Sequence, residues 1–193
     1  MLGNDNSGKK TILKMYSDTK YEESHMATLG LDYITKNYTP KNSVETFQVK
    51  IFDTTGLERF RTFSPSIYKT VQGIVVVFDV ANEESFSNVK KWLEAIAEHA
   101  DSSKCFVLVG NTDDPDHRKI SIAEARELAK SYNLEYFECT AKLNLGITEF
   151  FEALFTQIFN KRISGDASQT KSAILNPKVN ASNPPEEKKC NLF

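Results

Sequence analysis

The chain has 193 residues, which suits one domain with a substantial core and a short tail. Hydrophobic residues make up 40% and charged residues 26%, and the net charge of −2 argues against general nucleic-acid binding, which requires a basic face. Three widely spaced cysteines indicate a reducing compartment instead of a disulfide framework. The longest apolar run, 74–78, is too short to cross a bilayer, and the polar first residues do not resemble a signal peptide. We therefore expect a cytosolic protein, to which any membrane anchor is added chemically.

The hydrophobic periodicity predicts strands that alternate with helices. In chain order these are a helix at 11–17, strands at 31–38 and 44–52, a loop at 53–66, a strand at 73–80, a helix at 82–100, a strand at 105–111, a helix at 121–133, a strand at 134–141 and a helix at 144–163. This order predicts an α/β domain with a mainly parallel central sheet flanked by helices. We expect this domain to span 1–163 and a flexible tail rich in Ser, Asn, Lys and Pro to span 164–193.

The first residues, MLGNDNSGKK, contain a candidate phosphate-binding loop. Gly3, Gly8 and Lys9 fit the G-x-x-x-x-G-K part of the P-loop pattern, while Lys10 stands where the pattern has Ser or Thr. Glycines let backbone N–H groups approach phosphate oxygens at the start of a helix, and Lys9 would reach the outer phosphates. The alternative is an ordinary polar loop with a solvated lysine.

Further fragments follow this loop in an order typical of one family. The segments ATLGLDY, DTTGLERFR, GNTDD and CTAK resemble the switch I, switch II, base-reading and final base-contacting motifs of Ras-superfamily small GTPases. LGLDY, ERFR, IYKT and NVKKWL resemble the Rab branch in particular, and the resemblance extends from Gly3 to about Arg162. It implies a P-loop small-GTPase fold that binds GTP or GDP with Mg²⁺. It also implies a monomeric switch in vesicle and membrane traffic, with effector proteins contacting LGLDY and Arg59–Tyr68.

The resemblance assigns roles to individual residues. Thr28 and Asp53 would hold Mg²⁺, and Tyr21 would cover the guanine ring. Asp114 would accept hydrogen bonds from guanine N1–H and its 2-amino group, which adenine cannot offer. The expected nucleotide-binding residues are Gly3, Gly8, Lys9, Lys10, Thr11, Tyr21, Thr28, Asp53, Gly56, Asn111, Asp114, Thr140, Ala141 and Lys142. Each also has an ordinary alternative as a turn, strand-edge or surface residue.

Two other groups of residues have simpler interpretations. An apolar stripe near the end of the predicted domain indicates core packing against the sheet. It consists of Phe150, Phe151, Leu154, Phe155, Ile158 and Phe159. His25, His99 and His117 lack partners at metal-ligand spacing.

The last residues, KKCNLF, place Cys190 at the CaaX position for prenylation, and the terminal Phe193 suggests a geranylgeranyl group. A prenyltransferase and a membrane would then be partners, with Lys188 and Lys189 as a thin basic supplement. A single lipid chain predicts reversible attachment to the cytoplasmic face of endomembranes, with a cytosolic pool. The alternative is a free exposed thiol.

Several positions depart from the family pattern. Lys10 removes the hydroxyl that ligates Mg²⁺, and we expect its ammonium to replace the ion's charge or to pair with Asp53. Leu57 stands where relatives have the glutamine that orients the attacking water, so no catalytic residue is assigned and hydrolysis should be weak or absent. Asp5 and Asn6 replace small residues beside the phosphates. Thr112 replaces a lysine that braces the base-reading loop against the phosphate loop, which should weaken guanine binding.

The first strand of the fold is the most serious departure, because only Met1 and Leu2 precede Gly3. We expect a gap in the sheet that these residues cannot fill, with unpaired buried backbone groups that cost about 1–3 kcal/mol each. The sequence would then be an N-terminally incomplete product, our preferred explanation, or its fold would be compromised. The function predicted here is a GTP-binding switch. The alternatives are a pseudo-GTPase scaffold that binds partners without nucleotide and a truncated product with no independent function.

Overall fold

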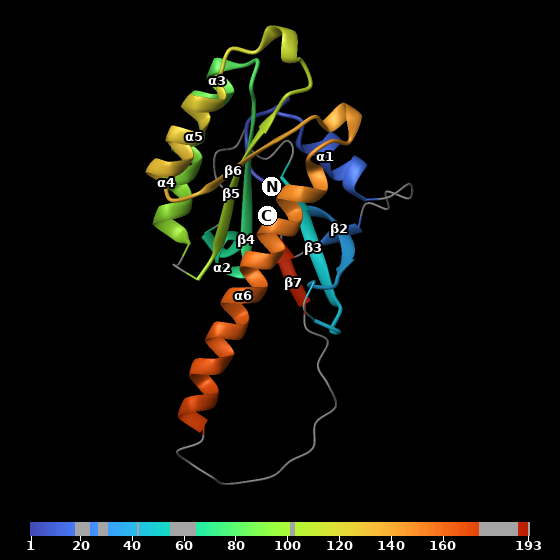
Figure 1. Cartoon of the computed structure of the whole chain (residues 1–193), viewed down its shortest axis with the longest axis vertical. Helices are drawn as coiled ribbons and strands as arrows, with labels where there is room; N and C mark the ends of the chain where they lie inside the picture. The colour runs from blue at the N-terminus through green and yellow to red at the C-terminus, as the bar shows by residue number, and fades with distance from the viewer. Residues whose placement is uncertain are drawn as a thin grey trace.

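One mixed sheet runs through the middle of the molecule, with helices on both faces (Figure 1). The computed structural model describes residues 1–17, 24–26, 31–41, 43–54, 65–100, 103–173 and 189–192. In spatial order the strands are β1 (Ser24–Met26), β2 (Leu31–Tyr38), β3 (Phe47–Asp53), β7 (Lys189–Leu192), β4 (Gly73–Asp79), β5 (Cys105–Asn111) and β6 (Glu135–Cys139). β1, β2 and β3 pair antiparallel, and β3, β7, β4, β5 and β6 pair parallel. The predicted α/β class with a mainly parallel sheet is confirmed.

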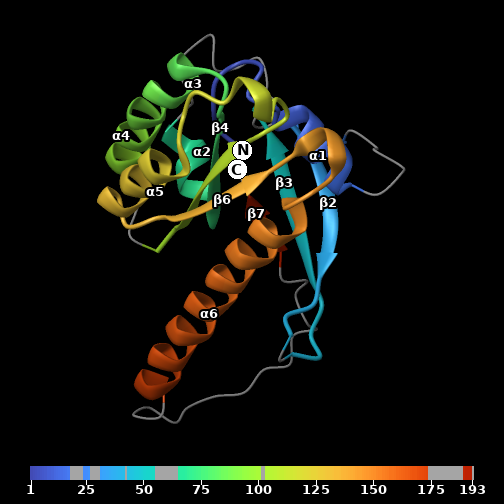
Figure 2. The same cartoon turned by 45° about the horizontal axis from the view of Figure 1, so that its top comes forward.

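The helices divide between the two faces of the sheet (Figures 1 and 2). They are α1 (Lys9–Tyr16), α2 (Pro65–Thr70), α3 (Glu83–Ser87), α4 (Val89–His99), α5 (Ile122–Ser131) and α6 (Ile147–Ala173). α1 and α6 cover one face, and α2 to α5 cover the other. The single helix predicted at 82–100 is divided at Asn88, whose N–H donates to Glu84 O (3.0 Å) while its side chain accepts from Lys91 Nζ (2.7 Å). The predicted capping box of Ser121 and Glu124 is present at the start of α5.

Alternate residues of the central strands pack into two separate hydrophobic cores, one on each face of the sheet. In β4, Val75 and Val77 pack on the side of α1 and α6, whereas Ile74 and Val76 pack on the side of α4 and α5. The stripe predicted to be core is confirmed: Phe150, Phe151, Leu154, Phe155 and Ile158 are buried on α6, and Phe159 is half-buried. The ring of Tyr16 stacks on Phe151 with 4.2 Å between centroids, which fixes α1 against α6.

The place between β3 and β4 is occupied by two pieces of chain from opposite ends of the sequence. Leu2 N–H donates to Val75 O (2.7 Å) and Leu2 O accepts from Val77 N–H (2.8 Å), so Leu2 pairs parallel to β4. The Met1 amino group donates to Phe52 O (2.8 Å) on the other side. β7 fills the rest of this place. The prediction that Met1 and Leu2 leave an open gap is therefore wrong, because both residues are buried and paired and β7 completes the sheet.

The C-terminal part of the chain also differs from its predicted description. α6 continues past Ile163 to Ala173, because each added residue contributes a further backbone hydrogen bond and no proline interrupts it. β7 lies within the segment predicted to be a flexible tail. None of the helices in the described part of the chain is long and apolar enough to cross a membrane.

The contact between α1 and α6 gives a test of this packing. We expect Phe151→Ala to lower the free energy of unfolding by about 3–5 kcal/mol, because it leaves a cavity beneath Tyr16. Ile163→Ala on the same helix, where the side chain is 51% exposed, should change it by less than about 0.5 kcal/mol. Urea unfolding followed by circular dichroism measures both, and equal losses would contradict the packing described here.

Candidate functional site

The loop between Leu2 and α1 approaches two other segments so closely that only glycine fits. Gly3 has φ +143°, and a Cβ there would lie 2.1 Å from Val77 O. Gly8 has φ +93°, and a Cβ there would lie 2.2 Å from Asn111 Nδ2. Between them Asn6 has φ +63°, a conformation that asparagine tolerates better than most residues. The loop is thus held against the carboxyl ends of β4 and β5.

Lys9 lies inside this loop. Its side chain is 2% exposed, and Nζ donates to Gly3 O (2.9 Å) and Asn4 O (2.8 Å). Lys9 is also the first residue of α1, and the first N–H groups of an α-helix have no intrahelical acceptor. Among the buried side-chain atoms of the described residues, Ser7 Oγ has no hydrogen-bond partner. Glycines, a buried ammonium, an unpaired hydroxyl and a helix start suit a phosphate group.

Asn111 connects the loop Gly3–Lys9 to the segment that is expected to contact the base. Its Nδ2 donates to Ser7 O (3.3 Å), and its Oδ1 accepts from Ala141 N–H (3.2 Å). Asn111 is 3% exposed at the end of β5, so these bonds are shielded from water. The structure therefore brings together Gly8, Asn111 and Ala141, as predicted for one site.

Asp113 is a residue of this site that the sequence analysis missed. Its Oδ1 accepts from Lys142 N–H (2.8 Å) and its Oδ2 accepts from Asn111 Nδ2 (3.1 Å). Asp113 thus clamps the two base-contacting segments together. The pattern offered only two adjacent aspartates after a strand, and the family motif assigned a role to the second of them.

Asp114 lies on the surface instead. Its Oδ1 is 2.8 Å from Nδ1 of His117. Among the described residues, no hydrogen bond joins Asp114 to Ala141 or Lys142. The hydrogen bond from His117 lowers the pKa of Asp114, with a smaller contribution from the nearby charge of Lys142. Asp114 therefore presents an ionised carboxylate at the rim of the site.

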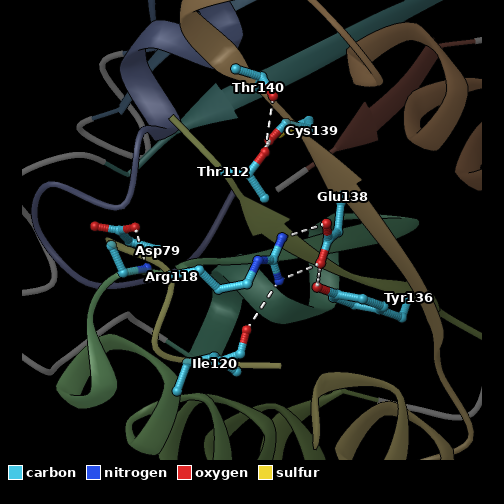
Figure 3. A network of polar contacts seen from close by, with 9 residues as sticks. Asp79, Thr112, Arg118, Ile120, Tyr136, Glu138, Cys139 and Thr140 are labelled. Carbon is cyan, nitrogen blue, oxygen red and sulfur yellow. Dashed lines mark hydrogen bonds and ion pairs between the residues drawn. The ribbon is translucent and has the colours of Figure 1, made fainter. Parts of the chain in front are cut away.

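Thr112 joins the segment after β5 to the segment at the end of β6 (Figure 3). Its N–H donates to Cys139 O (2.7 Å), and its Oγ1 lies 2.9 Å from Oγ1 of Thr140. Because Thr112 replaces a lysine, the sequence predicted the loss of a brace between the base-reading loop and the phosphate loop. In the structure Asn111 links these two loops through its hydrogen bond to Ser7 O.

A charged cluster holds the loop after β5 against β6 (Figure 3). Arg118 binds Glu138 through two hydrogen bonds (3.0 and 2.7 Å) and also donates to Ile120 O (3.0 Å). Tyr136 donates to the same carboxylate (2.6 Å). Burial raises the pKa of Glu138, but the hydrogen bonds from Arg118 and Tyr136 outweigh it, so the net pKa is lowered. Burial also raises the pKa of the neighbouring Cys139 thiol to about 12, so that thiol stays protonated.

The expected metal side of the site is only partly described. Asp53 is half-buried at the end of β3, Thr11 is half-buried in α1, and Lys10 is exposed beside it. Tyr21, Thr28, Gly56 and Leu57 lie outside the described residues. Within the described ranges no group of three or more His, Cys, Asp or Glu residues is arranged to hold a metal ion. Thr28 and Asp53 are the expected Mg²⁺ ligands, and only Asp53 lies among the described residues.

Comparison with known proteins agrees with this arrangement. The model of the Ras family matches residues 1–160. Ras-related protein RABD2a of Arabidopsis thaliana is 35% identical over 168 residues, which are 86% of this chain and 82% of the relative. Ras-related protein RAB1BV of Beta vulgaris is 33% identical over 171 residues, 88% of this chain and 79% of the relative. GTP-binding protein ypt1 of Schizosaccharomyces pombe is 32% identical over 180 residues, 93% of this chain and 87% of the relative.

The charged cluster predicts a pH-dependent stability. We expect Glu138→Gln to lower the free energy of unfolding by about 1–2 kcal/mol at pH 7, because it leaves the half-buried Arg118 without its anionic partner. Since the folded-state pKa of Glu138 is lowered, its contribution is present above the ordinary value of 4.5 and is lost as the pH falls below it. The difference between wild type and Glu138→Gln should therefore shrink at acid pH.

Glu127→Gln is the matched control, because Glu127 is exposed on α5. Urea titrations at pH 7 and at acid pH measure both variants. A Glu138→Gln effect that equals that of Glu127→Gln, or that persists unchanged in acid, would contradict the role of the cluster.

Proposed function

Since the chain belongs to the Ras family, as a Rab-type small GTPase, we propose that it is a guanine-nucleotide-binding switch in vesicle and membrane traffic with weak or absent GTP hydrolysis. The observation that carries the proposal is the loop from Gly3 to Lys9, in which two tightly packed glycines precede a buried lysine at the start of α1. The remaining contacts arrange the other half of the site around it.

The phosphate half of the site depends on charge and backbone geometry. The ammonium of Lys9 is bonded to the carbonyls of Gly3 and Asn4, which hold it inside the loop. Backbone N–H groups at the start of α1 and the helix dipole favour an anion there. Ser7 Oγ, buried and without a partner in the described residues, supplies a further hydroxyl that a phosphate oxygen would satisfy.

In the half of the site that would bind the guanine base, neighbouring residues have different roles. We assign the reading of guanine to Asp114, whose exposed carboxylate would accept hydrogen bonds from N1–H and the 2-amino group. His117 holds that carboxylate through its hydrogen bond. Asp113 is a positioning residue, because it ties Asn111 to the Lys142 backbone. We also assign Thr140, Ala141 and Lys142 to the base half of the site.

The departures at Lys10 and Leu57 bear on Mg²⁺ and on hydrolysis. Mg²⁺, when bound, would neutralise the outer phosphates, with Asp53 and Thr28 as the expected residues on the protein side. Lys10 is an exposed cation at the position of the usual hydroxyl, so we expect nucleotide binding to depend only weakly on Mg²⁺. Leucine at position 57 offers neither donor nor acceptor to a water molecule, so GTP should persist once bound.

Membrane attachment and partner binding complete the proposal. A prenyl group on Cys190 would anchor the chain reversibly to the cytoplasmic face of endomembranes, with a cytosolic pool and a monomeric state. Effectors would contact the surface around LGLDY and Arg59–Tyr68, most of which lies outside the described residues.

A second candidate is a scaffold with the same fold that binds partners without nucleotide. It is favoured by the bonds of Lys9 to the loop's own carbonyls, which satisfy part of its charge without any ligand. Nucleotide retention distinguishes the two functions. A chain that is folded by circular dichroism and carries no nucleotide would support the scaffold.

We expect the purified chain to retain GTP, which denaturation and ion-exchange chromatography would identify. Leu57→Gln should retain mainly GDP, because the glutamine restores a group that orients the attacking water and raises single-turnover cleavage by about tenfold or more. GDP in the unaltered chain would contradict slow hydrolysis, while leaving guanine-nucleotide binding intact.

Paired variants of the adjacent aspartates test the assignment of the base. Asp114→Asn should weaken GTP binding by about tenfold to a hundredfold but affect inosine triphosphate less, because inosine lacks the 2-amino group. Asp113→Asn should weaken both nucleotides equally, because it loosens the segment that carries Lys142. Competition titrations with a fluorescent nucleotide measure both, and the reverse pattern would exchange the two roles.

A further inference from the structure

β7 occupies an inner position of the sheet, although it is formed by the last residues of the chain that the structure describes. It pairs parallel to β3 over Gln48↔Lys189, Val49↔Cys190, Lys50↔Asn191 and Ile51↔Leu192. It also pairs with β4, at Gly73↔Leu192. We propose that the place between β3 and β4 is a strand-acceptor site for the chain's own C-terminal segment, Lys189–Leu192, and that binding there masks Cys190 from modification.

The acceptor site is formed by buried backbone on both sides. Val49 and Ile51 of β3 are 2% and 0% exposed, and Gly73 and Ile74 of β4 are buried. Without β7, the facing N–H and C=O groups of β3 and the start of β4 would lack strand partners in the interior. This unsatisfied backbone is what would draw an extended segment into the sheet, irrespective of its side chains.

β7 and the first two residues of the chain lie one after the other along β3. Leu192 is in register with Ile51, and the Met1 amino group bonds the next residue of β3, at Phe52 O. Leu2 then pairs with Val76 of β4. Figures 1 and 2 both show β7 entering the sheet from the side on which α6 projects. The two pieces thus follow one another along β3 and share the place of a single strand.

The connection is long enough for the segment to come from the same molecule. α6 ends at Ala173, about 22 Å along the helix axis beyond Ile158, which lies against Gly73. The 15 residues between Ala173 and Lys189 can span about 50 Å when extended. Intramolecular binding is therefore within reach, and it needs no second copy of the chain.

Masking follows from the backbone position of Cys190. Its register partner is Val49, in the middle of the acceptor site. A modifying enzyme must draw the last residues into its own cleft, and the same backbone cannot also pair with β3 and β4. This consequence for lipidation rests on the proposed prenylation of Cys190, whereas the acceptor site itself does not. The C-terminal segment would then alternate between a bound and a released state.

A disulfide test reports on the bound state directly. Neighbouring strands lie about 4.8 Å apart, within the Cα separations of about 4.4–6.8 Å that disulfides span. We expect Val49→Cys to form an intramolecular disulfide with Cys190 under mild oxidation, identified by mass spectrometry of the linked peptides. Lys50→Cys is the matched control, because its register partner is Asn191 and alternate residues of a strand face opposite sides.

The outcomes of this test are distinct. An intramolecular link in Val49→Cys and none in Lys50→Cys supports the proposal. A covalent dimer means that the segment comes from a second copy, and the proposed intramolecular occupant is then wrong. The absence of any link, or a link in Lys50→Cys alone, overturns the site or its register.

Thiol labelling tests the masking without requiring any lipid donor. In the folded full chain we expect maleimide to label Cys190 at least about tenfold more slowly than in Asn191→Pro, because proline removes an N–H from the middle of β7. Glu187→Pro, outside β7, should label as slowly as the unaltered chain. Equal rates in all three chains would overturn the masking. Slow labelling of the unaltered chain, combined with no lipid on Cys190 in cells in either the unaltered chain or the released Asn191→Pro variant, would refute the proposed prenylation alone.

Discussion

The pairing of Leu2 with β4 positions most of the candidate site. Two backbone hydrogen bonds, to Val75 O and from Val77 N–H, fix the direction in which the chain leaves the sheet. The next residue, Gly3, must then pass over Val77 O so closely that a side chain has no room. From this starting point the loop turns back to Lys9 and α1. The loop Gly3–Lys9 therefore depends on backbone pairing that precedes it by one residue, and the packing of Tyr16 on Phe151 fixes the helix that follows it.

The polar contacts across the site form a connected set. Asn111 bonds the phosphate loop at Ser7 O and the base-contacting segment at Ala141 N–H. Asp113 adds a bond to Lys142 N–H, and the cluster of Arg118, Glu138 and Tyr136 holds the following loop to β6. Because the two bonds of Asn111 are buried and join segments that are far apart in the chain, they fix the relative positions of the two halves of the site. Because these segments are already held in place, the binding of a nucleotide would require little further loss of conformational entropy.

Local patterns in the sequence predicted those parts of the fold that local interactions determine. The strands at 31–38 and 105–111 have the predicted limits, the capping box begins α5, and the apolar stripe on α6 is buried. The candidate site followed from short motifs, and the structure places Gly8, Asn111 and Ala141 together as those motifs predict. Tyr21, Thr28, Gly56 and Leu57 remain predictions.

Most of the features that local sequence patterns do not predict depend on tertiary contacts. The division of the helix at Asn88 is instead a local change of the backbone, with φ −74° and ψ −14° at that residue, which helical periodicity does not reveal. Asp113 and Asp114 are indistinguishable by type, and only the direction of the backbone after β5 separates them. β7 was the hardest to foresee, because a segment of only four residues carries too short a pattern to predict a strand. Its partners lie more than a hundred residues earlier in the chain.

That distance in sequence also affects how the protein is made. During synthesis β3, β4 and β5 leave the ribosome long before Lys189–Leu192, so the sheet lacks one inner piece until these residues emerge. Contacts between such distant segments form slowly, and the unpaired edges of β3 and β4 would meanwhile be exposed to other chains. The nascent protein would then need a chaperone's protection most in the interval between the emergence of β4 and that of Lys189–Leu192.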